Sequence, residues 1–467
     1  MIFITSNGNH LSTIEVGALP DMVTFTPDGE KLLVANEGEP NDDYSVNPEG
    51  SVSIIDVGSG ADQAETIETA TFTDEIIEEN VRKVHPDSSY VEDLEPEFIA
   101  VTSDSSLAYV VLQENNAIAT LDLNENKFTS VKSLGYKDHS EAGNGMDVSD
   151  KDRKINIQQW PVLGIHQPDA IALYETNGKT YIVTPNEGDA QDYEGFSEEA
   201  RAAELQDKVA FNADLFAGFS QEELDQLVED DLFADENLGR LNVTTSAPTN
   251  EDEQYEALYS FGGRSFSIFD ADTMELVFDS GDEFEQKLAE INPDFFNTNH
   301  EEDAFDDRSD NKGPEPETVE LAEIDGKTYA FIALERDGGL FVYDITNPAE
   351  AKYEAYFSTR DFSDEDTPSD NAPEGLTFVP ASKSPSGEPT LLASYEISGT
   401  VASFTIGSGN SSTAPTETIH TVQTGDTLFE IGLRYNYLWT TLEKTNNLEN
   451  PHLIYPGDEI TIKWEGA

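Results

Sequence analysis

The sequence predicts an all-β protein, with a β-propeller over residues 1–406 and a small module of two strands and two helices over residues 416–467. Two observations carry the propeller prediction. Short segments rich in Val, Ile, Phe and Tyr alternate with Gly, Asp, Asn and Pro turns, which is typical of strands. A motif also recurs in a fixed order in units of roughly forty to sixty residues, as expected of propeller blades.

The repeated motif starts with Pro, an acidic residue and an aliphatic residue. It continues through a turn into an apolar strand that ends in Glu, and then into a strand that ends in Asp. Five copies begin at Leu19, Glu95, Gln167, Pro316 and Pro373, and FGGRSFSIFD (Phe261–Asp270) is a partial sixth copy. We expect seven blades, the first of them incomplete, because Ile2–Val16 resembles the end of a blade whose beginning is missing.

Two segments interrupt this pattern. Glu194–Leu238 contains FSEEARAAELQDKVA and SQEELDQLVEDDLF, whose apolar spacing is helical, so we expect an insertion with helices at about 194–238. Gly407–Pro415 reads GSGNSSTAP and has no charged residue, in a chain that is 26% charged. Such a Gly/Ser-rich stretch predicts a flexible linker between the propeller and the tail.

The composition excludes several classes of function. Net charge is −70, from 95 acidic and 25 basic residues, so nucleic acids and anionic lipids are excluded as partners. Cysteine is absent, which excludes disulfides, thiol nucleophiles and thiolate metal sites. No apolar run of about 18 residues predicts a membrane span, and residues 1–20 carry no export signal. Most of the acids fit a solvated surface adapted to salt or to alkaline surroundings.

Two sets of acids recur in register along the propeller. One set follows the proline of each motif: Asp21, Glu97, Asp169, Glu317 and Glu374. The other ends the following strand: Glu37, Glu114, Glu187, Glu335 and Glu396. Because equivalent positions of blades are related by rotation about the channel, these acids are expected to form rings. Ten carboxylates this close raise one another's pKa unless a cation intervenes, so we predict bound Ca²⁺, or another divalent metal, at one mouth of the channel. The alternative is that each acid of the first set accepts backbone N–H bonds in its turn.

A second metal candidate is NGMDVSDKD (Asn144–Asp152), which places Asp147, Asp150 and Asp152 close together in sequence. It lacks the spacing of an EF-hand, so an acidic surface turn is the competing interpretation. NHEEDAFDDRSDN (Asn299–Asn311) is also rich in acids, and there a solvated loop is expected.

No catalytic residue is identified by motif. The sequence contains no GxSxG elbow, HExxH, P-loop or GxGxxG, so any hydrolysis would depend on a metal held by carboxylates. Among the few arginines, Arg240, Arg264, Arg308 and Arg336 are expected to pair with acids. Alternatively, Arg264 and Arg336 hold a phosphate beside the metal.

Long stretches of residues 1–406 resemble the choice-of-anchor I family. They include GALPDMVTFTPDG, LVANEGEPNDDYSVNPEGSVSIIDV, GNGMDVSDKD, PDAIALYETNGKTYIVTPNEGDA, FGGRSFSIFDAD, LVFDSGDEFEQ and NKGPEPE, in that order. That family includes mesenchyme-specific cell surface glycoproteins and proteins described as alkaline phosphatases. The resemblance implies a secreted or surface-displayed propeller with a role in calcium handling. It also implies a further stretch before residue 1, and so a truncated start.

The tail resembles a LysM module over Thr418–Lys463. HTVQTGDTLFEIGLRY, LWTTLEKTNNL and NPHLIYPGDEITI match its strand, turn, helices and closing strand. The resemblance implies binding of peptidoglycan or another N-acetylglucosamine polymer. By motif, the groove comprises Gly425, Asp426, Thr427, Leu428, Leu453, Ile454, Tyr455 and Pro456. The same residues also form a capping turn and a β-turn, and we expect both roles to hold.

Together these features predict an extracellular, calcium-binding propeller anchored in the cell wall through its LysM tail. The alternative is a metal-dependent phosphoesterase, of the alkaline-phosphatase or phosphodiesterase type, tethered in the same way.

Overall fold

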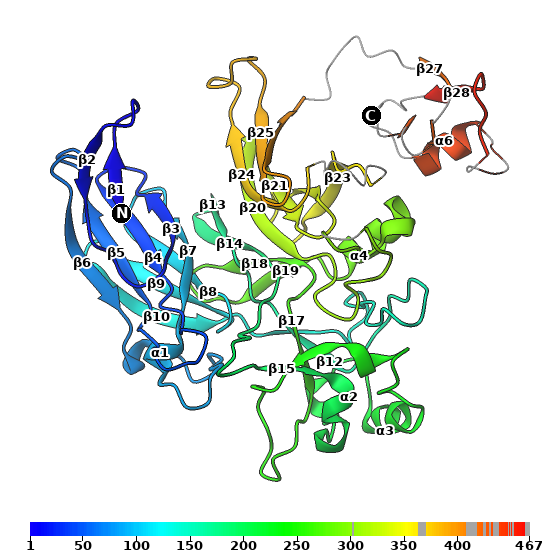
Figure 1. The fold of residues 1–467 in the computed structure, drawn as a ribbon, viewed down its shortest axis with the longest axis horizontal. Coiled ribbons are helices and arrows are strands. Elements are labelled where there is room, and N and C mark those ends of the chain that lie inside the picture. The colour runs from blue at the N-terminus through cyan, green and yellow to red at the C-terminus, as the bar shows by residue number, and fades with distance from the viewer. Residues whose placement is uncertain are drawn as a thin grey trace.

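Five antiparallel sheets follow one another along the described part of the chain (Figure 1). The structure, a computed structural model, describes residues 1–300, 303–362, 370–407 and 418–462, the last range with gaps at 424–425, 429–430, 433–438, 447, 449 and 451–452. The expected linker at 407–415 therefore lies outside the described residues, apart from Gly407.

The first two sheets are four-stranded meanders in chain order. The strands of the first sheet are β3 (Pro20–Phe25), β4 (Lys31–Asn36), β5 (Ser51–Asp56) and β6 (Glu65–Thr71). The strands of the second are β7 (Pro96–Val101), β8 (Leu107–Leu112), β9 (Ala117–Asp122) and β10 (Lys127–Ser133). Between the two sheets lie η1 (Asp74–Ile76) and the short helix α1 (Tyr90–Asp93), which Ser89 and Glu92 cap reciprocally.

The other three sheets follow the same plan. The third contains β13 (Ala172–Thr176), β14 (Lys179–Pro185), β18 (Phe266–Asp270) and β19 (Leu276–Asp279). The fourth contains β20 (Pro316–Ile324), β21 (Lys327–Leu334), β22 (Gly339–Asp344) and β23 (Lys352–Ser358). The fifth contains β24 (Pro373–Val379), β25 (Thr390–Tyr395) and β26 (Thr400–Thr405). Helix α4 (Glu283–Ile291) and η5 (Pro293–Phe295) lie between the third and fourth sheets.

The partial sixth copy of the motif does not start a blade of its own. Its strand β18 pairs with β14, five residues in register from Tyr181↔Asp270 to Pro185↔Phe266, and so completes the third sheet. The chain leaves the third sheet after β14 and returns to it at β18. Alternation of apolar residues marks a strand but does not say which sheet the strand joins.

The segment between β14 and β18 builds a separate layer. Its strands β15 (Glu199–Arg201), β16 (Asn242–Thr244) and β17 (Leu258–Phe261) join β11 (Tyr136–Asp138) and β12 (Val162–Ile165) in a five-stranded sheet. The helical elements of this layer are α2 (Ala202–Leu205), η2 (Gln206–Lys208), η3 (Ala213–Leu215), α3 (Gln221–Glu229) and η4 (Leu238–Arg240). Ser220 and Glu223 form a capping box at the start of α3, and Leu224 buries the apolar face of the helix in the core of this layer.

Separate apolar cores join each sheet to the next. The first and second sheets share one core, the second and third another, the third and fourth a third, and the fourth and fifth a last one. Strands that read as continuous apolar runs, such as β4 and β8, are buried on both faces for this reason. Neighbouring sheets therefore pack face to face, as propeller blades do.

On its other face the first sheet is covered by the hairpin of β1 (Ile2–Ile4) and β2 (His10–Thr13). Leu32, Val34 and Ile55 of the sheet pack there against Phe3 and other residues of the N-terminal segment. Among the described residues there are thus five blade-like sheets and this hairpin, against the seven blades expected.

The tail has a small core of its own. Strand β27 (Thr418–Thr421) pairs antiparallel with β28 (Glu459–Ile462), and α6 (Trp439–Asn446) packs on them through Leu442. Nowhere in the described ranges is there a helix with both the length and the apolar character that crossing a bilayer requires.

Candidate functional site

Four of the five acids of the first set occupy bulges at the starts of blades, and the fifth, Asp169, lies just before β13. Pro20, Pro96, Pro316 and Pro373 are the first residues of β3, β7, β20 and β24, and the acid comes second in each. In all four strands the pairing register shifts at this point. An extra residue in a strand re-aims its side chain, and bulges recur beside functional sites for that reason.

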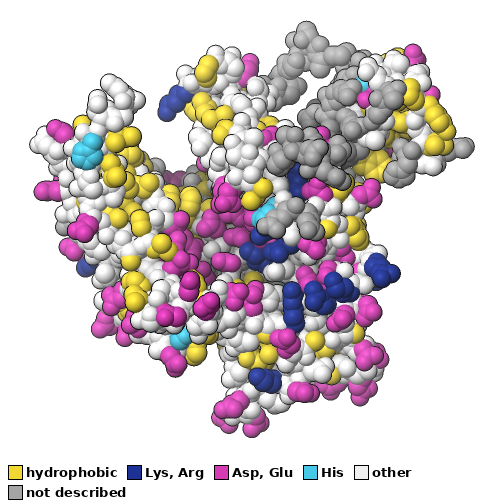
Figure 2. All heavy atoms as spheres, in the orientation of Figure 1, with side chains coloured by type: hydrophobic (Ala, Val, Ile, Leu, Met, Phe, Trp, Pro, Cys, Tyr) yellow, Lys and Arg dark blue, Asp and Glu magenta, His cyan; other side chains and the backbone are white. Residues whose placement is uncertain are grey.

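The second set of acids lies at the same end of the sheets. Glu335 and Glu396 directly follow β21 and β25, and Glu37 directly follows β4. Because adjacent strands are antiparallel, the start of the first strand and the end of the second meet at one edge. Acidic side chains accordingly gather in the hollow at the centre of the face shown in Figure 2.

Electrostatic coupling shows that acids of different sheets lie near one another. Burial, and then the neighbouring Asp21 and Glu374, raise the pKa of Asp169 to about 7. Burial, followed by Glu39, Asp21 and Asp169, raises the pKa of Glu37 to about 8. The whole channel cluster linked in this way comprises Asp21, Glu37, Glu97, Glu114, Asp169, Glu187, Glu317, Glu335, Glu374 and Glu396.

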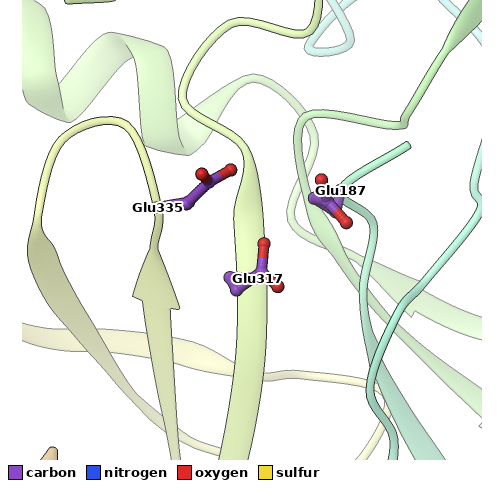
Figure 3. A group of neighbouring side chains, drawn as sticks. All are labelled: Glu187, Glu317 and Glu335. Atoms are coloured by element: carbon purple, nitrogen blue, oxygen red, sulfur yellow. The ribbon is translucent and has the colours of Figure 1, made fainter. Parts of the chain in front are cut away.

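Three of these acids converge most closely. Glu187, Glu317 and Glu335 each offer an oxygen, and these oxygens all lie within 4.8 Å of one another (Figure 3). Within the described residues no other three acidic or histidine side chains meet this criterion. Burial raises the pKa of Glu187 to about 8 and that of Glu317 well above its usual range, with Glu187 the next cause at Glu317. Glu187 and Glu317 therefore resist ionisation unless a further cation joins them.

Buried oxygens without partners also mark the channel cluster. One oxygen of Glu97 and one of Glu114 are buried and accept no hydrogen bond from a nitrogen or hydroxyl group, although the two carboxyls can share a proton with each other. Burial, and then Glu114, raise the pKa of Glu97 well above its usual range. An unpartnered buried oxygen is costly, and oxygen ligands of this kind fit a hard cation such as Ca²⁺.

Two basic side chains, Lys312 and Arg336, border the triad on one side. Lys312 Nζ lies 2.8 Å from Glu187 and 3.1 Å from Glu315, and Arg336 lies 3.0 Å from Glu315 and 3.3 Å from Glu335. Although burial opposes it, Lys312, Arg308 and Arg336 together lower the pKa of Glu315 to about 2. Glu315 is thus a permanent anion that holds these cations in place. Lys312 and Glu315 were not predicted as site residues, although both lie in NKGPEPE just before Glu317.

Glycines position the carboxylate of Glu187. Gly188 has φ +94°, and a Cβ there would lie 2.2 Å from the backbone nitrogen of Gly262. Gly262 has φ +74°, and its Cβ would lie 2.1 Å from the carbonyl oxygen of Glu187. The two backbones touch where β14 ends, and only glycine allows that approach.

The two arginines proposed for anion binding have different surroundings. Arg336 borders the triad, and His300 also contacts Glu335, at 3.0 Å. Arg264 lies elsewhere, buried against α4. It contacts Glu285 at 2.7 Å and donates to the carbonyl oxygens of Asp147, Ser309 and Asn311. The structure thus does not bring Arg264 to the channel cluster.

The loop with Asp147, Asp150 and Asp152 is also separate from the channel cluster. Asp147 is fully buried and accepts from the backbone nitrogen of Asn156. Asp150 pairs with Arg240 at 3.1 Å and with Lys151. Asp147 and Asp150 therefore have different neighbours. The charge of Asp150 is already balanced by Arg240 and Lys151.

The groove residues of the LysM tail differ in exposure, and one of them, Gly425, is outside the described residues. Leu453 and Tyr455 are 55% and 58% exposed, whereas Leu428 is buried in the small core. Asp426 accepts hydrogen bonds from His420, at 2.6 Å, and from the backbone nitrogen of Gln423, at 2.8 Å. These two hydrogen bonds give Asp426 a structural role in the turn.

A cavity of about 390 Å³ adjoins this groove. It is lined by Asp426, Thr427, Leu428, Trp439 and Ile454 of the tail, and by the propeller segment 291–295. The Trp439 indole donates to the carbonyl oxygen of Ile291 at 3.2 Å. Trp439 was not among the predicted groove residues.

The family of the chain follows from comparison with known proteins. A family model described as the choice-of-anchor I domain matches residues 1–348, and a LysM domain model matches residues 420–463. The chain belongs to the choice-of-anchor I family. The resemblances read from the sequence are thereby confirmed, and the choice-of-anchor I domain is here joined to a LysM domain.

Two named proteins are similar to parts of this chain. Gigasin-3a of Magallana gigas is 32% identical over 181 residues, which cover 36% of this chain and 64% of that protein. The mesenchyme-specific cell surface glycoprotein of Strongylocentrotus purpuratus is 27% identical over 279 residues, covering 54% of this chain and 35% of that protein. The chain thus spans only part of each relative.

Two solved structures align with most of the chain, and one of them is named as a β-propeller domain. The Cps50 (Swd1) β-propeller domain of Myceliophteria thermophila aligns with a TM-score of 0.31 and 12% identity, over 82% of this chain and 81% of that one. The periplasmic gluconolactonase of Pseudomonas aeruginosa aligns with a TM-score of 0.32 and 12% identity, over 87% and 91%. Such scores carry no inference about activity.

Proposed function

We propose that this protein is an extracellular, cell-wall-associated propeller that binds Ca²⁺ at the channel cluster and is retained on an N-acetylglucosamine polymer, such as peptidoglycan, by its LysM domain. One observation carries the calcium part. Glu187, Glu317 and Glu335 bring three carboxylate oxygens within 4.8 Å of one another, and Glu187 and Glu317 are buried. Calcium accepts six to eight oxygen ligands in flexible geometry, which suits carboxylates from two different blades.

The surface location rests on the two domains together. LysM domains bind N-acetylglucosamine polymers, and one relative of the propeller is named a cell surface glycoprotein. The large acid excess fits exposure to a salty or alkaline exterior.

A metal-dependent phosphoesterase is the second candidate. The observation that favours it is the position of Lys312 and Arg336 beside the triad, where cations would face a phosphate held by the metal. Against it, both side chains are paired with the permanently ionised Glu315. We therefore favour a binding protein over an enzyme.

Calorimetric titration with Ca²⁺ tests the channel site. The full chain is first treated with a chelator to remove bound metal, and is then called the chelated protein. Glu317→Gln and Glu335→Gln are expected to weaken binding by more than about tenfold, because each removes one charged ligand. The exposed Glu388→Gln serves as a matched control and should bind like the wild type. Equal affinity of Glu317→Gln and Glu388→Gln would refute the channel site.

Turnover of p-nitrophenyl phosphate and its diester separates the two functions. With Ca²⁺, Mg²⁺ or Zn²⁺ present, we expect no release of p-nitrophenol above that of the chelated protein. Metal-dependent release that Glu335→Gln abolishes would overturn the binding function in favour of the phosphoesterase.

A further inference from the structure

A second group of buried acids lies outside the channel, where the loop 144–156 meets the segment that follows α4. Asp147 and Asp152 belong to the loop, Glu285 to α4, and Asp306 to the later segment. Asp147, Glu285 and Asp306 are each at most 1% exposed. Sequence separation hides this group, since about 140 to 160 residues of chain divide the loop from its partners.

The oxygens of Glu285 are fully committed. One accepts from Arg264 at 2.7 Å and from the Asn297 side-chain amide at 2.9 Å, and the other accepts from the backbone nitrogen of Asp147 at 2.9 Å. The guanidinium of Arg264 therefore donates its hydrogen bonds to Glu285 and to backbone carbonyls. Asp147 and Asp306 form no ion pair with the basic residues that the structure describes, whereas Asp152 has Lys154 as its partner.

Three oxygens of this group have no hydrogen-bond partner although they are buried. They are Oδ2 of Asp152, Oδ2 of Asp306 and Oδ1 of Asn297. The other oxygen of Asp306 accepts from Ser309 at 2.6 Å, and Asn297 donates to the same hydroxyl at 2.9 Å, so both side chains are held firmly. The nearest cation to the free oxygen of Asp152 is Lys154, at 3.7 Å. Buried oxygens left unpaired are destabilising, so each needs a partner.

The remaining charges repel one another. Burial, and then Asp147 and Asp152, raise the pKa of Asp306 to about 8. Burial, and then Glu285 and Asp152, raise the pKa of Asp147 to about 7. Carboxylates from both segments therefore lie within each other's field in a place that water does not reach.

The backbone is strained at the same point. Asn297 has φ +42° and Asp306 has φ +68°, values that favour glycine. Residues other than glycine keep such backbone angles only where the surrounding structure holds them there. Each of these two residues carries one of the unpartnered buried oxygens.

We propose that Asp147, Asp152, Asp306 and the side-chain oxygen of Asn297 bind a Ca²⁺ ion that ties the 144–156 loop to the 296–311 segment. Three carboxylates and an amide oxygen are the hard, flexible ligand set that Ca²⁺ prefers over Mg²⁺. Because the three carboxylates do not all lie within 4.8 Å of one another, ion binding has to draw the two segments together. The site is structural and independent of the channel cluster. Asp150 takes no part in it, since Arg240 and Lys151 neutralise that residue.

Hydrogen exchange of the full chain, chelated or with Ca²⁺, tests this proposal. Peptides covering 144–156 and 296–311 are expected to exchange more slowly with Ca²⁺ and to be unchanged by Mg²⁺ at the same concentration. Asp306→Asn should abolish this protection while leaving that of the channel residues intact, and Glu317→Gln should do the reverse. Asp294→Asn, an exposed change in the neighbouring η5, is the matched control.

A milder variant separates loss of the ligand from loss of folding. Asp152→Asn keeps the side-chain oxygen that accepts from the backbone nitrogen of Lys154 but removes a charged ligand, so it is expected to weaken calcium binding at this site by about tenfold. Protection of both segments that is equal in the wild type and Asp306→Asn, or calcium affinity unchanged in Asp152→Asn, would overturn the proposal.

Discussion

Lys312 donates a hydrogen bond of 2.8 Å to Glu187, a residue 125 positions earlier in the chain. Its ammonium group also contacts Glu315 at 3.1 Å. The lysine thus stands at the edge of the acid triad and supplies one of the positive charges that the triad needs. An ion bound among Glu187, Glu317 and Glu335 would compete with it for the carboxylate of Glu187.

Lys312→Met is therefore expected to destabilise the chelated protein more than the calcium-loaded one. Breaking a buried ion pair costs about 3–5 kcal/mol, and Ca²⁺ can replace the lost ammonium as the partner of Glu187. Thermal unfolding with EDTA and with Ca²⁺ measures the effect, and the calcium-induced rise in Tm should be larger in the variant than in the wild type. An equal rise in both would contradict the role given to Lys312, and the exposed Lys383→Met controls for loss of charge.

A second prediction concerns Arg264, which pairs with the buried Glu285 and has a structural role. Arg264→Leu leaves the buried Glu285 without its cation and should lower the free energy of unfolding by about 3–5 kcal/mol. Arg264→Lys retains the charge but not the planar fork, so its loss should be smaller. Urea unfolding of both variants measures this order, with the exposed Arg153→Lys as control. A stability of Arg264→Leu equal to that of the wild type would show that the arginine is not needed there.

The channel cluster could be predicted from the sequence because its determinants are local. A proline and an acid open a blade, and the hairpin returns the strand end to the same edge. Glu317 and Glu335 thus meet through one turn of chain. The motif recurs, so the positions of the other eight acids follow from those of a single blade.

The second group of buried acids and the strand order of the third sheet depend on packing between distant segments, which no local pattern predicts. Asp306 and Asn297 meet Asp147 only because α4 docks against the loop after β11. The strand of FGGRSFSIFD likewise joins the third sheet only because the intervening layer folds as a unit. Lys312 could have been found, since a lysine beside repeated acids in NKGPEPE is rare in so acidic a chain.

The exposed apolar residues of the LysM groove give a third prediction. Tyr455→Ala removes a large side chain that is 58% exposed, and it should reduce retention on purified peptidoglycan by about tenfold, which corresponds to 1.4 kcal/mol of binding energy. Ile419→Ala removes a similarly exposed apolar side chain from β27, outside the groove, and should retain binding. Co-sedimentation of the full chain measures both, with a chain lacking residues 416–467 as the baseline. Equal loss in both variants would mean that the groove is placed wrongly.

The fourth prediction concerns acid stability and rests on His139. Burial, and then Lys137, lower the pKa of His139 to about 3. Its Nδ1 donates to the carbonyl oxygen of Asn144 at 2.7 Å, so the ring is held neutral, with Nε2 buried and unprotonated. The unfolded chain, with an ordinary histidine pKa near 6.5, therefore binds one more proton than the folded chain between about pH 3 and pH 6.5.

This histidine should make the protein less stable as pH falls through that window, by at most about 1.4 kcal/mol per pH unit. His139→Asn retains a donor near the position of Nδ1 but does not titrate, so its free energy of unfolding should fall less steeply with acid. Urea unfolding at several values between pH 4 and pH 7 compares the two slopes. His10→Asn, at an exposed position in β2, is the control and should follow the wild type. Parallel slopes for His139→Asn and the wild type would exclude His139 as a source of acid sensitivity.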